Sequence, residues 1–335
     1  MRRFTVEERR ARLAVRHHLA PAARTDDVAA IAGDLVGLHS SDPSTVFLSA
    51  AARMRNPSVE SVERALYDER SLVRTLCMRR TMFVVPVELV PVVQAGCTEA
   101  LIAAERRRTL AMMQQAGITD PEAELSALTE ATLAAIDASG EATGAELSRT
   151  VPGLNRQFAV GEGTKWAGTV GLSTRVLFLL STEQRIVRGR PRGSWTSSQY
   201  RWSPMSSWLP AEARTMEADV ARVELAWRWL GAFGPATVAD LKWWTGLGVA
   251  QVKRALAALE VEEVDLDGEV GIVLAGDVDA PAAPEPWVAL LPGLDPTTMG
   301  WKQRSWYLGG HGPALFDRNG NAGPTVWCDG RVVGG

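Results

Sequence analysis

The chain has 335 residues, of which 46% are apolar and 22% are charged. This is the composition of a globular protein and argues against a disordered or fibrous chain. At about 100 to 200 residues per domain, the length predicts two or three domains. A formal net charge of −3 argues against a nonspecific polycation, although residues 181–204 carry five arginines and one acidic residue and form a distinctly basic segment.

The sequence predicts a cytoplasmic protein that needs no cofactor and no metal. The longest apolar run, Met82–Val93, contains two prolines and a glutamate and is too short to span a bilayer. The first ten residues have mixed charge and lack the apolar stretch of a secretory signal. The histidines lack the spacing of a metal site, and the widely separated cysteines are expected to be reduced core thiols. These cysteines are Cys77, Cys97 and Cys328.

The chain begins with two predicted helices. Thr5 and Glu8 have the spacing of a capping box at the start of a helix that ends near His18. We expect His17 and His18 to be solvated there, where protonated side chains favour the helix dipole. Apolar residues recur every three or four positions over residues 26–38, which predicts a second helix with a buried face.

A third helix is expected from Pro43, because proline fits the first position of a helix, with Asp42 as its N-cap. A fourth helix is expected over residues 59–67. Residues 72–85 are β-rich at both ends around Met78-Arg-Arg80, as in a strand pair. Several helices followed by a hairpin are typical of a winged helix, so residues 1–120 are predicted to form a first winged-helix module.

The same order of elements returns twice. Residues 121–204 predict helices followed by a strand, a tip and a strand, with the tip at Arg188-Gly-Arg-Pro-Arg-Gly193. Residues 205–280 predict three helices and a hairpin, in which Asp267-Gly268 is a strong turn signal. Residues 281–335 consist of short apolar runs separated by Gly and Pro, which predict a small β-rich domain.

Together these patterns predict an α+β fold, with tandem winged-helix (helix-turn-helix) modules followed by a small β-barrel-like domain. The chain ends at Val333-Gly-Gly335, inside a predicted strand, so we expect the barrel to lack a C-terminal piece. Nearly all basic residues are arginines, which suit phosphate and base-edge contacts. A GC-rich genome would give the same bias.

Five segments of the chain resemble a known family. They are similar to the winged-helix DNA-binding-domain family that contains the AlkZ-like and YcaQ-like DNA glycosylases. These segments are Leu35–Pro43, Leu48–Arg53, Met78–Thr81, Leu290–Asp295 and Asp317–Pro324. The resemblance implies a C-shaped clamp of three winged helices and a β-barrel around double-stranded DNA, and the excision of alkylated purines, including bulky adducts and crosslinks. It also implies a monomer associated with the nucleoid.

The chain departs from the family at the catalytic motif. Characterised members carry Gln-x-Gln or Gln-x-Asp at the place of His39-Ser40-Ser41, and often a His at the place of Phe83. Excision of an N3- or N7-alkylated purine needs little leaving-group protonation, because the base already carries positive charge. The remaining tasks are to stabilise an oxocarbenium-like sugar and to position water.

Three residues are candidates for these tasks. A neutral His39 can accept a proton from the attacking water, Ser41 can orient that water, and Asp42 can act electrostatically. Each has a plainer interpretation: His39 as a buried side chain with satisfied hydrogen bonds, Ser41 as part of a turn, and Asp42 as a helix N-cap. The residues alone leave both interpretations open.

The candidate DNA contacts lie in the predicted wings and in one family segment. Guanidinium groups on a hairpin can reach phosphates while the hairpin follows a groove. A merely solvated turn is the alternative for the wing arginines, and a structural role is the alternative for the two residues of the family segment. The candidates are Arg79 and Arg80 in the first wing, Arg188, Arg190 and Arg192 in the second, and Arg318 and Asn319 in the family segment near the C-terminus.

Two functions are compatible with the sequence. The first is a monofunctional DNA glycosylase that hydrolyses the N-glycosidic bond of alkylated purines in duplex DNA. The second is a noncatalytic winged-helix DNA-binding protein, a regulator or lesion sensor, because both motif glutamines are lost. A small-molecule hydrolase is disfavoured, since the sequence has no Gly-x-Ser-x-Gly and no metal motif.

Overall fold

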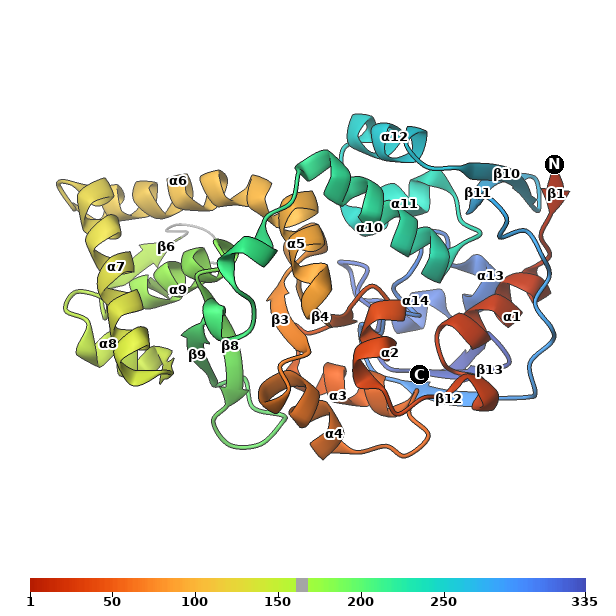
Figure 1. The fold of residues 1–335 in the computed structure, drawn as a ribbon, viewed down its shortest axis with the longest axis horizontal. Coiled ribbons are helices and arrows are strands. Elements are labelled where there is room, and N and C mark those ends of the chain that lie inside the picture. Colours follow the sequence, from red (N-terminus) through yellow and green to blue (C-terminus); the bar gives the residue numbers. More distant parts are fainter. Residues whose placement is uncertain (161–167) are drawn as a thin grey trace.

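A computed structural model describes residues 1–160 and 168–335 of the chain. Figure 1 shows an elongated molecule with two unequal lobes. The smaller lobe contains the middle of the chain, and the larger lobe combines the N-terminal and C-terminal parts. The mixed helices and small sheets confirm the predicted α+β class.

The N-terminal part forms the predicted helices and hairpin. Thr5 caps the first helix in a capping box with Glu8, and Asp42 caps the third by accepting a hydrogen bond from the Ser44 amide at 2.8 Å. A three-stranded sheet with the order β2-β4-β3 follows. The elements are α1 (Val6–Arg16), α2 (Val28–Asp34), β2 (Leu38–His39), α3 (Pro43–Ala51), α4 (Val59–Glu63), β3 (Leu72–Leu76) and β4 (Met82–Pro86).

A helical stretch over Val87–Gln115 connects the two lobes (Figure 1). It includes α5 (Val90–Val93) and α6 (Glu99–Gln115). Its apolar side chains enter the core of the larger lobe at one end and the core of the smaller lobe at the other. By length and composition it is the one described segment that is long and apolar enough to cross a membrane. Core helices of soluble proteins also pass this test, so the absence of a membrane span stays a prediction.

The smaller lobe contains the second hairpin. Its strands are β8 (Ile186–Pro191) and β9 (Tyr200–Pro204), so the tip falls at residues 192–199 and not at the predicted 188–193. Arg188 and Arg190 therefore lie on a strand, because the pairing with β9 continues to Pro191. The remaining elements are α7 (Pro121–Ser139), β5 (Ala142–Thr143), α8 (Gly144–Thr150), β6 (Gln157–Val160), β7 (Gly168–Gly171) and α9 (Leu172–Thr182).

The third group of helices and its hairpin match the predicted order. The hairpin turn has positive φ at Asp267, 55°, and at Gly268, 93°, as a two-residue turn between antiparallel strands requires. Strand β1 (Arg2–Arg3) adds to this hairpin in parallel with β10, a pairing that the sequence did not predict. The other elements are α10 (Ala218–Phe233), α11 (Val238–Thr245), α12 (Val249–Ala257), β10 (Val261–Leu266) and β11 (Glu269–Leu274).

The C-terminal part corrects the prediction of a barrel. It forms a three-stranded antiparallel sheet, and the described residues contain no closed barrel. The segment between the first two strands forms turns and two short helices, because its glycines and prolines interrupt any longer strand. The elements are β12 (Val288–Leu291), α13 (Ser305–Leu308), α14 (Gly312–Leu315), β13 (Thr325–Cys328) and β14 (Arg331–Gly334).

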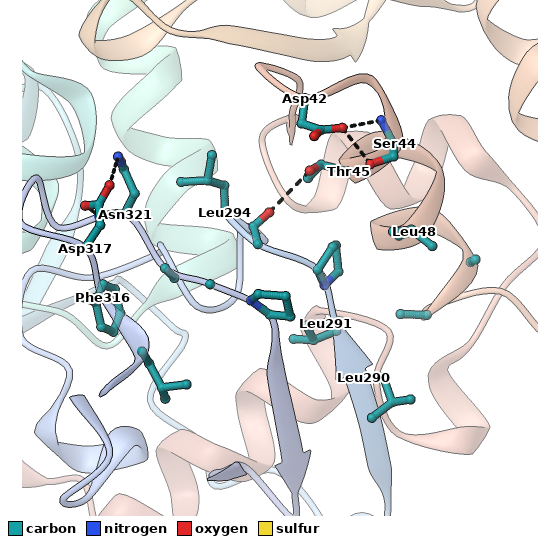
Figure 2. A pocket seen from close by; sticks show the side chains of 18 of the residues that line it. Asp42, Ser44, Thr45, Leu48, Leu290, Leu291, Leu294, Phe316, Asp317 and Asn321 are labelled. Atoms are coloured by element: carbon teal, nitrogen blue, oxygen red, sulfur yellow. Dashed lines mark hydrogen bonds between the residues drawn. The ribbon is translucent and has the colours of Figure 1, made fainter. Parts of the chain in front are cut away.

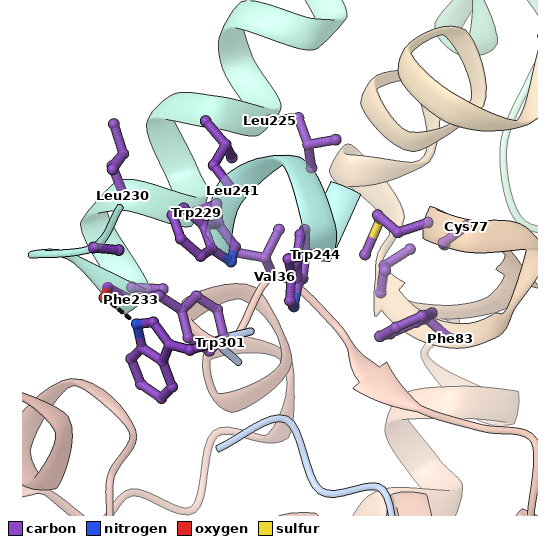
Figure 3. Packing of buried hydrophobic residues seen from close by; sticks show 14 of the residues in the cluster. Val36, Cys77, Phe83, Leu225, Trp229, Leu230, Phe233, Leu241, Trp244 and Trp301 are labelled. Atoms are coloured by element: carbon purple, nitrogen blue, oxygen red, sulfur yellow. Dashed lines mark hydrogen bonds between the residues drawn. The ribbon is translucent and has the colours of Figure 1, made fainter. Parts of the chain in front are cut away.

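One apolar core joins the N-terminal part, the third group of helices and the C-terminal part (Figure 3). At its centre, Trp229 stacks on Phe233 with ring centroids 5.7 Å apart, and Trp301 meets Phe233 edge to face at 5.2 Å. His17 enters the same core with no solvent exposure. The expectation that His17 is solvated is therefore wrong, because α1 docks on α10 and burial lowers the pKa of His17 to about 3.

Candidate active site and DNA-binding residues

The motif residue His39 lies at the end of β2, where it pairs with Phe83 of β4. Its side chain is only 6% exposed, and its ring meets the Phe83 ring edge to face at 5.3 Å. The strand is held further by the Ser40 amide, which donates to the Met82 carbonyl at 2.9 Å. The two departures from the family pattern, His39 and Phe83, are thus packed against each other.

His39 is neutral at pH 7. Burial, and then the charge of Arg79, lower its pKa to about 4. The Ser41 amide donates a long hydrogen bond to His39 Nδ1 at 3.4 Å, which assigns the proton to Nε2 and the lone pair to Nδ1. His39 can therefore accept a proton at Nδ1, and the exposed Ser41 lies beside that atom.

The middle residue of the motif has a partner that the sequence did not reveal. Arg74 of β3 donates a hydrogen bond to Ser40 Oγ, and its side chain is 3% exposed. The guanidinium carbon also lies 4.7 Å from the centre of the Tyr200 ring of β9. Arg74 thus connects the motif to the second hairpin, through contacts that only the fold creates.

Asp42 lies on an open cleft of about 1060 Å³. Its carboxylate accepts hydrogen bonds from the Ser44 amide and hydroxyl at 2.8 and 2.6 Å, and His39 and Ser41 do not line the cleft. Figure 2 shows Asp42 and α3 on one side and residues 290–294 and 316–321 on the other. Leu48, Leu290, Leu291, Leu294 and Phe316 make much of the lining apolar.

A buried ion pair fixes the two sides of this cleft to each other. Arg53 follows α3, Asp295 follows the segment 290–294, and neither side chain is exposed. Ser49 Oγ donates to the same carboxylate at 2.7 Å. The fold therefore brings four of the five segments that resemble the family to one place: 35–43, 48–53, 290–295 and 317–324.

The second hairpin packs on the larger lobe. Arg190 forms ion pairs with Glu63 at 2.7 Å and with Asp68 at 2.9 Å. Arg188 is half-buried, with its guanidinium carbon 5.3 Å from the Trp202 ring centre, and burial lowers its pKa. Both side chains thus have intramolecular contacts.

The tip of this hairpin carries Arg192, which is exposed. Within the described residues its guanidinium forms no hydrogen bond and no ion pair. Trp195 of the same tip packs against Phe47 of α3 with ring centroids 5.2 Å apart. The tip is therefore anchored on the helix that starts at the motif, while Arg192 remains free to bind an anion.

The first hairpin places its two arginines in different surroundings. Arg80 pairs with the nearly buried Glu105 of α6 at 2.9 Å. Arg79 instead has its guanidinium carbon 4.3 Å from the centre of the Trp243 ring of α11. Arg318 and Asn319 are exposed in a turn next to the cleft, where the Asn319 amide donates to Asp317 at 2.8 Å.

No group of three or more His, Cys, Asp or Glu side chains is placed to hold a metal ion within residues 1–160 and 168–335. The three cysteines are free thiols. Burial raises the pKa of Cys97 to about 12 and holds that of Cys77 well above its ordinary value, so neither of these two is a thiolate at pH 7.

Comparison with known proteins agrees with this arrangement. A family model described as "DNA glycosylase AlkZ-like" matches residues 32–335. An interstrand DNA cross-link repair glycosylase of Streptomyces sahachiroi is 27% identical over 313 residues, which cover 91% of this chain and 80% of that protein. The solved structure of Streptomyces sahachiroi DNA glycosylase AlkZ has a TM-score of 0.73, at 22% identity over 99% of this chain and 87% of that chain. This protein belongs to the AlkZ-like DNA glycosylase family.

Proposed function

We propose that this protein is a monofunctional DNA glycosylase that excises alkylated purines, including bulky adducts or crosslinks, from duplex DNA. The observation that supports this most is the convergence of four family segments around the cleft beside Asp42. A volume of about 1060 Å³ is at the upper end of typical ligand pockets. It is large enough for a purine with a bulky substituent, and its apolar lining suits one.

In the proposed reaction, water attacks C1′ of the damaged nucleotide as the bond between C1′ and the base nitrogen breaks. The bonding electrons return to the base, which is cationic before the step and leaves as a neutral purine. The water replaces the Ser41 amide as the hydrogen-bond donor to His39 Nδ1, and His39 Nδ1 then takes the proton of the water. Ser41 orients the water, and Asp42 stabilises the sugar cation by its charge. His39 and Ser41 lie outside the lining of the cleft, so in this proposal the extruded nucleotide and the water must reach them past Asp42.

The proposed architecture for DNA binding is a clamp of three winged-helix modules, at residues 1–120, 121–204 and 205–280, with residues 281–335 closing the cleft. The protein would bind double-stranded DNA as a monomer in the cytoplasm, at the nucleoid. Phosphate contacts are assigned to Arg79, Arg192 and Arg318, whose guanidinium groups form no ion pair within the described part of the chain. Arg80, Arg188 and Asn319 would join them where DNA supplements their present contacts, and Arg190 only where DNA displaces Glu63 and Asp68.

The test compares the unaltered protein with the His39→Ala variant on duplex DNA that carries N7-alkylguanine or N3-alkyladenine. Released base and abasic sites are measured under single-turnover conditions, with DNA binding measured in parallel. We expect base release by the unaltered protein and a loss of about 100-fold or more in the variant, the contribution of a positioned base. Binding without release, in both proteins, would instead favour a noncatalytic lesion sensor.

A further inference from the structure

We propose that Arg79 and Arg304, which both stack on Trp243, form a binding site for the DNA backbone next to the His39 motif. The site would take phosphodiester phosphates. This inference rests on the proposed function, because it places the DNA of that reaction. It adds two residues, Arg304 and Trp243, that neither the sequence patterns nor the family segments indicate.

Three segments that are distant in the sequence build this site. Arg79 lies in the turn between β3 and β4, Trp243 lies on α11, and Arg304 precedes α13. The guanidinium carbons of Arg79 and Arg304 lie 4.3 and 4.8 Å from the Trp243 ring centre. Arg304 also lies 4.3 Å from the ring centre of Phe316, which lines the cleft.

The backbone conformation at Arg79 and Gly246 brings the Arg79 side chain close to α11. Arg79 has a φ of 53°, in the left-handed region that non-glycine residues rarely adopt. Gly246, at the end of α11, also has a positive φ of 74°, and a Cβ at this position would lie only 3.0 Å from Arg79 Cγ. A conformation of this kind costs of order 1 kcal/mol or more and is concentrated at functional sites. Here it presents Arg79 to Trp243.

The site carries two positive charges without an ion pair. Within the described residues, neither Arg79 nor Arg304 has a carboxylate within salt-bridge distance, whereas the neighbouring Arg80 is paired with Glu105. Burial, and then the charge of Arg304, lower the pKa of Arg79. The charge of Arg304 thus opposes that of Arg79, so a phosphate that contacts either guanidinium offsets an unfavourable interaction as well as forming favourable ones.

The charge of Asp240 acts on Arg304, but within the described residues the two side chains form no ion pair. Asp240 is buried, and its Oδ1 accepts hydrogen bonds from the amides of Lys302 and Gln303, each at 2.9 Å. Its Oδ2 accepts from Thr237. Arg304 itself donates from Nε to the Trp301 carbonyl at 2.8 Å, which fixes the guanidinium without neutralising it. The charge of the site is therefore available to a ligand.

The Arg79–Arg304 site lies close to the motif residues that would act on the damaged nucleotide. Arg79 lies in the turn that leads into β4, and β4 pairs with the motif strand through Phe83 and His39, so a phosphate at Arg79 lies near the residues of the proposed reaction. The charge of Arg79 is also one of the two causes that lower the pKa of His39. The phosphate would also offset the positive charge of Arg79, which opposes a developing sugar cation. We infer that this site holds the backbone beside the damaged nucleotide.

The test measures the affinity for an undamaged DNA duplex as a function of salt concentration. Arg79→Ala and Arg304→Ala are compared with the unaltered protein and with Arg107→Ala. The last variant removes an exposed arginine of α6 that forms no ion pair with any other described residue. We expect each of the first two variants to reduce the slope of log affinity against log salt by about 0.9, the value for one lost phosphate contact. The Arg107 variant should keep the slope, and Arg79→Lys should restore it.

An unchanged slope and affinity in both Ala variants, with thermal unfolding that shows them folded, would overturn the proposal. The binding measurement needs no base release, so the two ideas can be separated. Normal slopes in the variants together with base release by the unaltered protein would reject only the phosphate site. Reduced slopes without base release would reject only the reaction.

Discussion

Arg53 and Asp295 form a two-point ion pair that is fully buried: Arg53 Nη2 lies 2.8 Å from Asp295 Oδ1, and Arg53 Nη1 lies 2.9 Å from Oδ2. The two residues are 242 positions apart in the sequence. Arg53 also donates to the His17 carbonyl at 3.0 Å and to Thr297 Oγ1 at 2.8 Å. The hydrogen bonds of the guanidinium are thus satisfied, and one side chain joins α1, α3 and the C-terminal part.

Replacing Asp295 by Asn should destabilise the protein strongly. The variant leaves the Arg53 charge buried and uncompensated, which typically costs about 3 to 5 kcal/mol. Unfolding in urea, followed by circular dichroism, measures the free energy of unfolding. The control is Glu130→Gln, which breaks the exposed pair with Arg185 and should change stability little. Similar losses in the two variants would contradict the assigned role of the buried pair.

The same pair predicts how stability depends on pH. Burial favours the neutral acid, but Arg53 and the hydrogen bonds to Asp295 outweigh it and leave the pKa of Asp295 lowered from 3.8. The folded state therefore binds this proton less readily than the unfolded state does. The contribution of ionised Asp295 to the free energy of unfolding is complete above about pH 4. It is lost as the pH falls through the pKa of Asp295 in the folded protein. The Asp295→Asn variant should lack this acid-dependent loss.

The histidines should titrate in separate pH ranges. Burial lowers the pKa of His39 to about 4 and that of His17 to about 3, whereas the hydrogen bond to Asp34 raises the pKa of His18. Between about pH 4 and 6.5 the unfolded chain protonates His39 and the folded protein does not, so this residue makes stability rise with pH in that window.

Nuclear magnetic resonance of the imidazole carbons can measure these values directly. Arg79→Ala should raise the pKa of His39, because the positive charge that lowers it is removed. Base release should rise with pH near 4 and be constant from about pH 6. A His39 signal that titrates near 6.5 in the folded protein would contradict both its burial and its assignment as a neutral base.

Ser40→Ala should lower the rate of base release more than it changes DNA affinity. The variant removes the acceptor of the hydrogen bond from Arg74, so the segment between His39 and Ser41 loses its anchor on β3. A buried guanidinium hydrogen without a partner costs about 1 to 3 kcal/mol, which urea unfolding can measure. The single-turnover rate of base release should fall, while the Kd for DNA stays nearly unchanged. Equal rates in a folded variant would show that Arg74 does not position the motif.

Features that depend on neighbouring residues in the sequence were predictable. The capping box of Thr5 and Glu8, the N-cap Asp42 and the turn at Asp267-Gly268 all form through contacts within a few residues. The physical reason is that a cap or tight turn satisfies local backbone groups. Such signals predicted the starts of α1 and α3 and the turn between β10 and β11.

Features that depend on distant partners were not predictable. His17 is buried because α10 and the C-terminal part cover the end of α1, and β2 exists because two residues pair with β4. The barrel prediction failed because short apolar runs do not specify whether a neighbouring strand is present. The partners of Arg74 and Arg304 likewise come from other segments. The motif therefore predicted His39, Ser41 and Asp42 as candidate site residues but could not predict the residues that contact them.

Variants of Arg190 can distinguish a structural role of this side chain from a contact with DNA. The sequence places it in a basic hairpin, and the fold surrounds it with Glu63, Asp68 and, at 4.8 Å, the Tyr67 ring. Because two carboxylates already compensate its charge, we expect Arg190→Gln to leave the salt dependence of DNA binding nearly unchanged. It should instead weaken the packing of the hairpin on α4 and increase amide hydrogen exchange in β8 and β9.

A double-mutant cycle with Glu63→Gln measures the coupling directly. If Arg190 acts through Glu63, the double variant should be little less stable than Arg190→Gln alone, because the second change removes a partner that is already lost. Independent, additive losses, together with a salt slope reduced by about 0.9, would instead identify Arg190 as a phosphate contact. The hairpin would then have to release Glu63 and Asp68 when DNA binds, and hydrogen exchange in the DNA complex would show that release at α4.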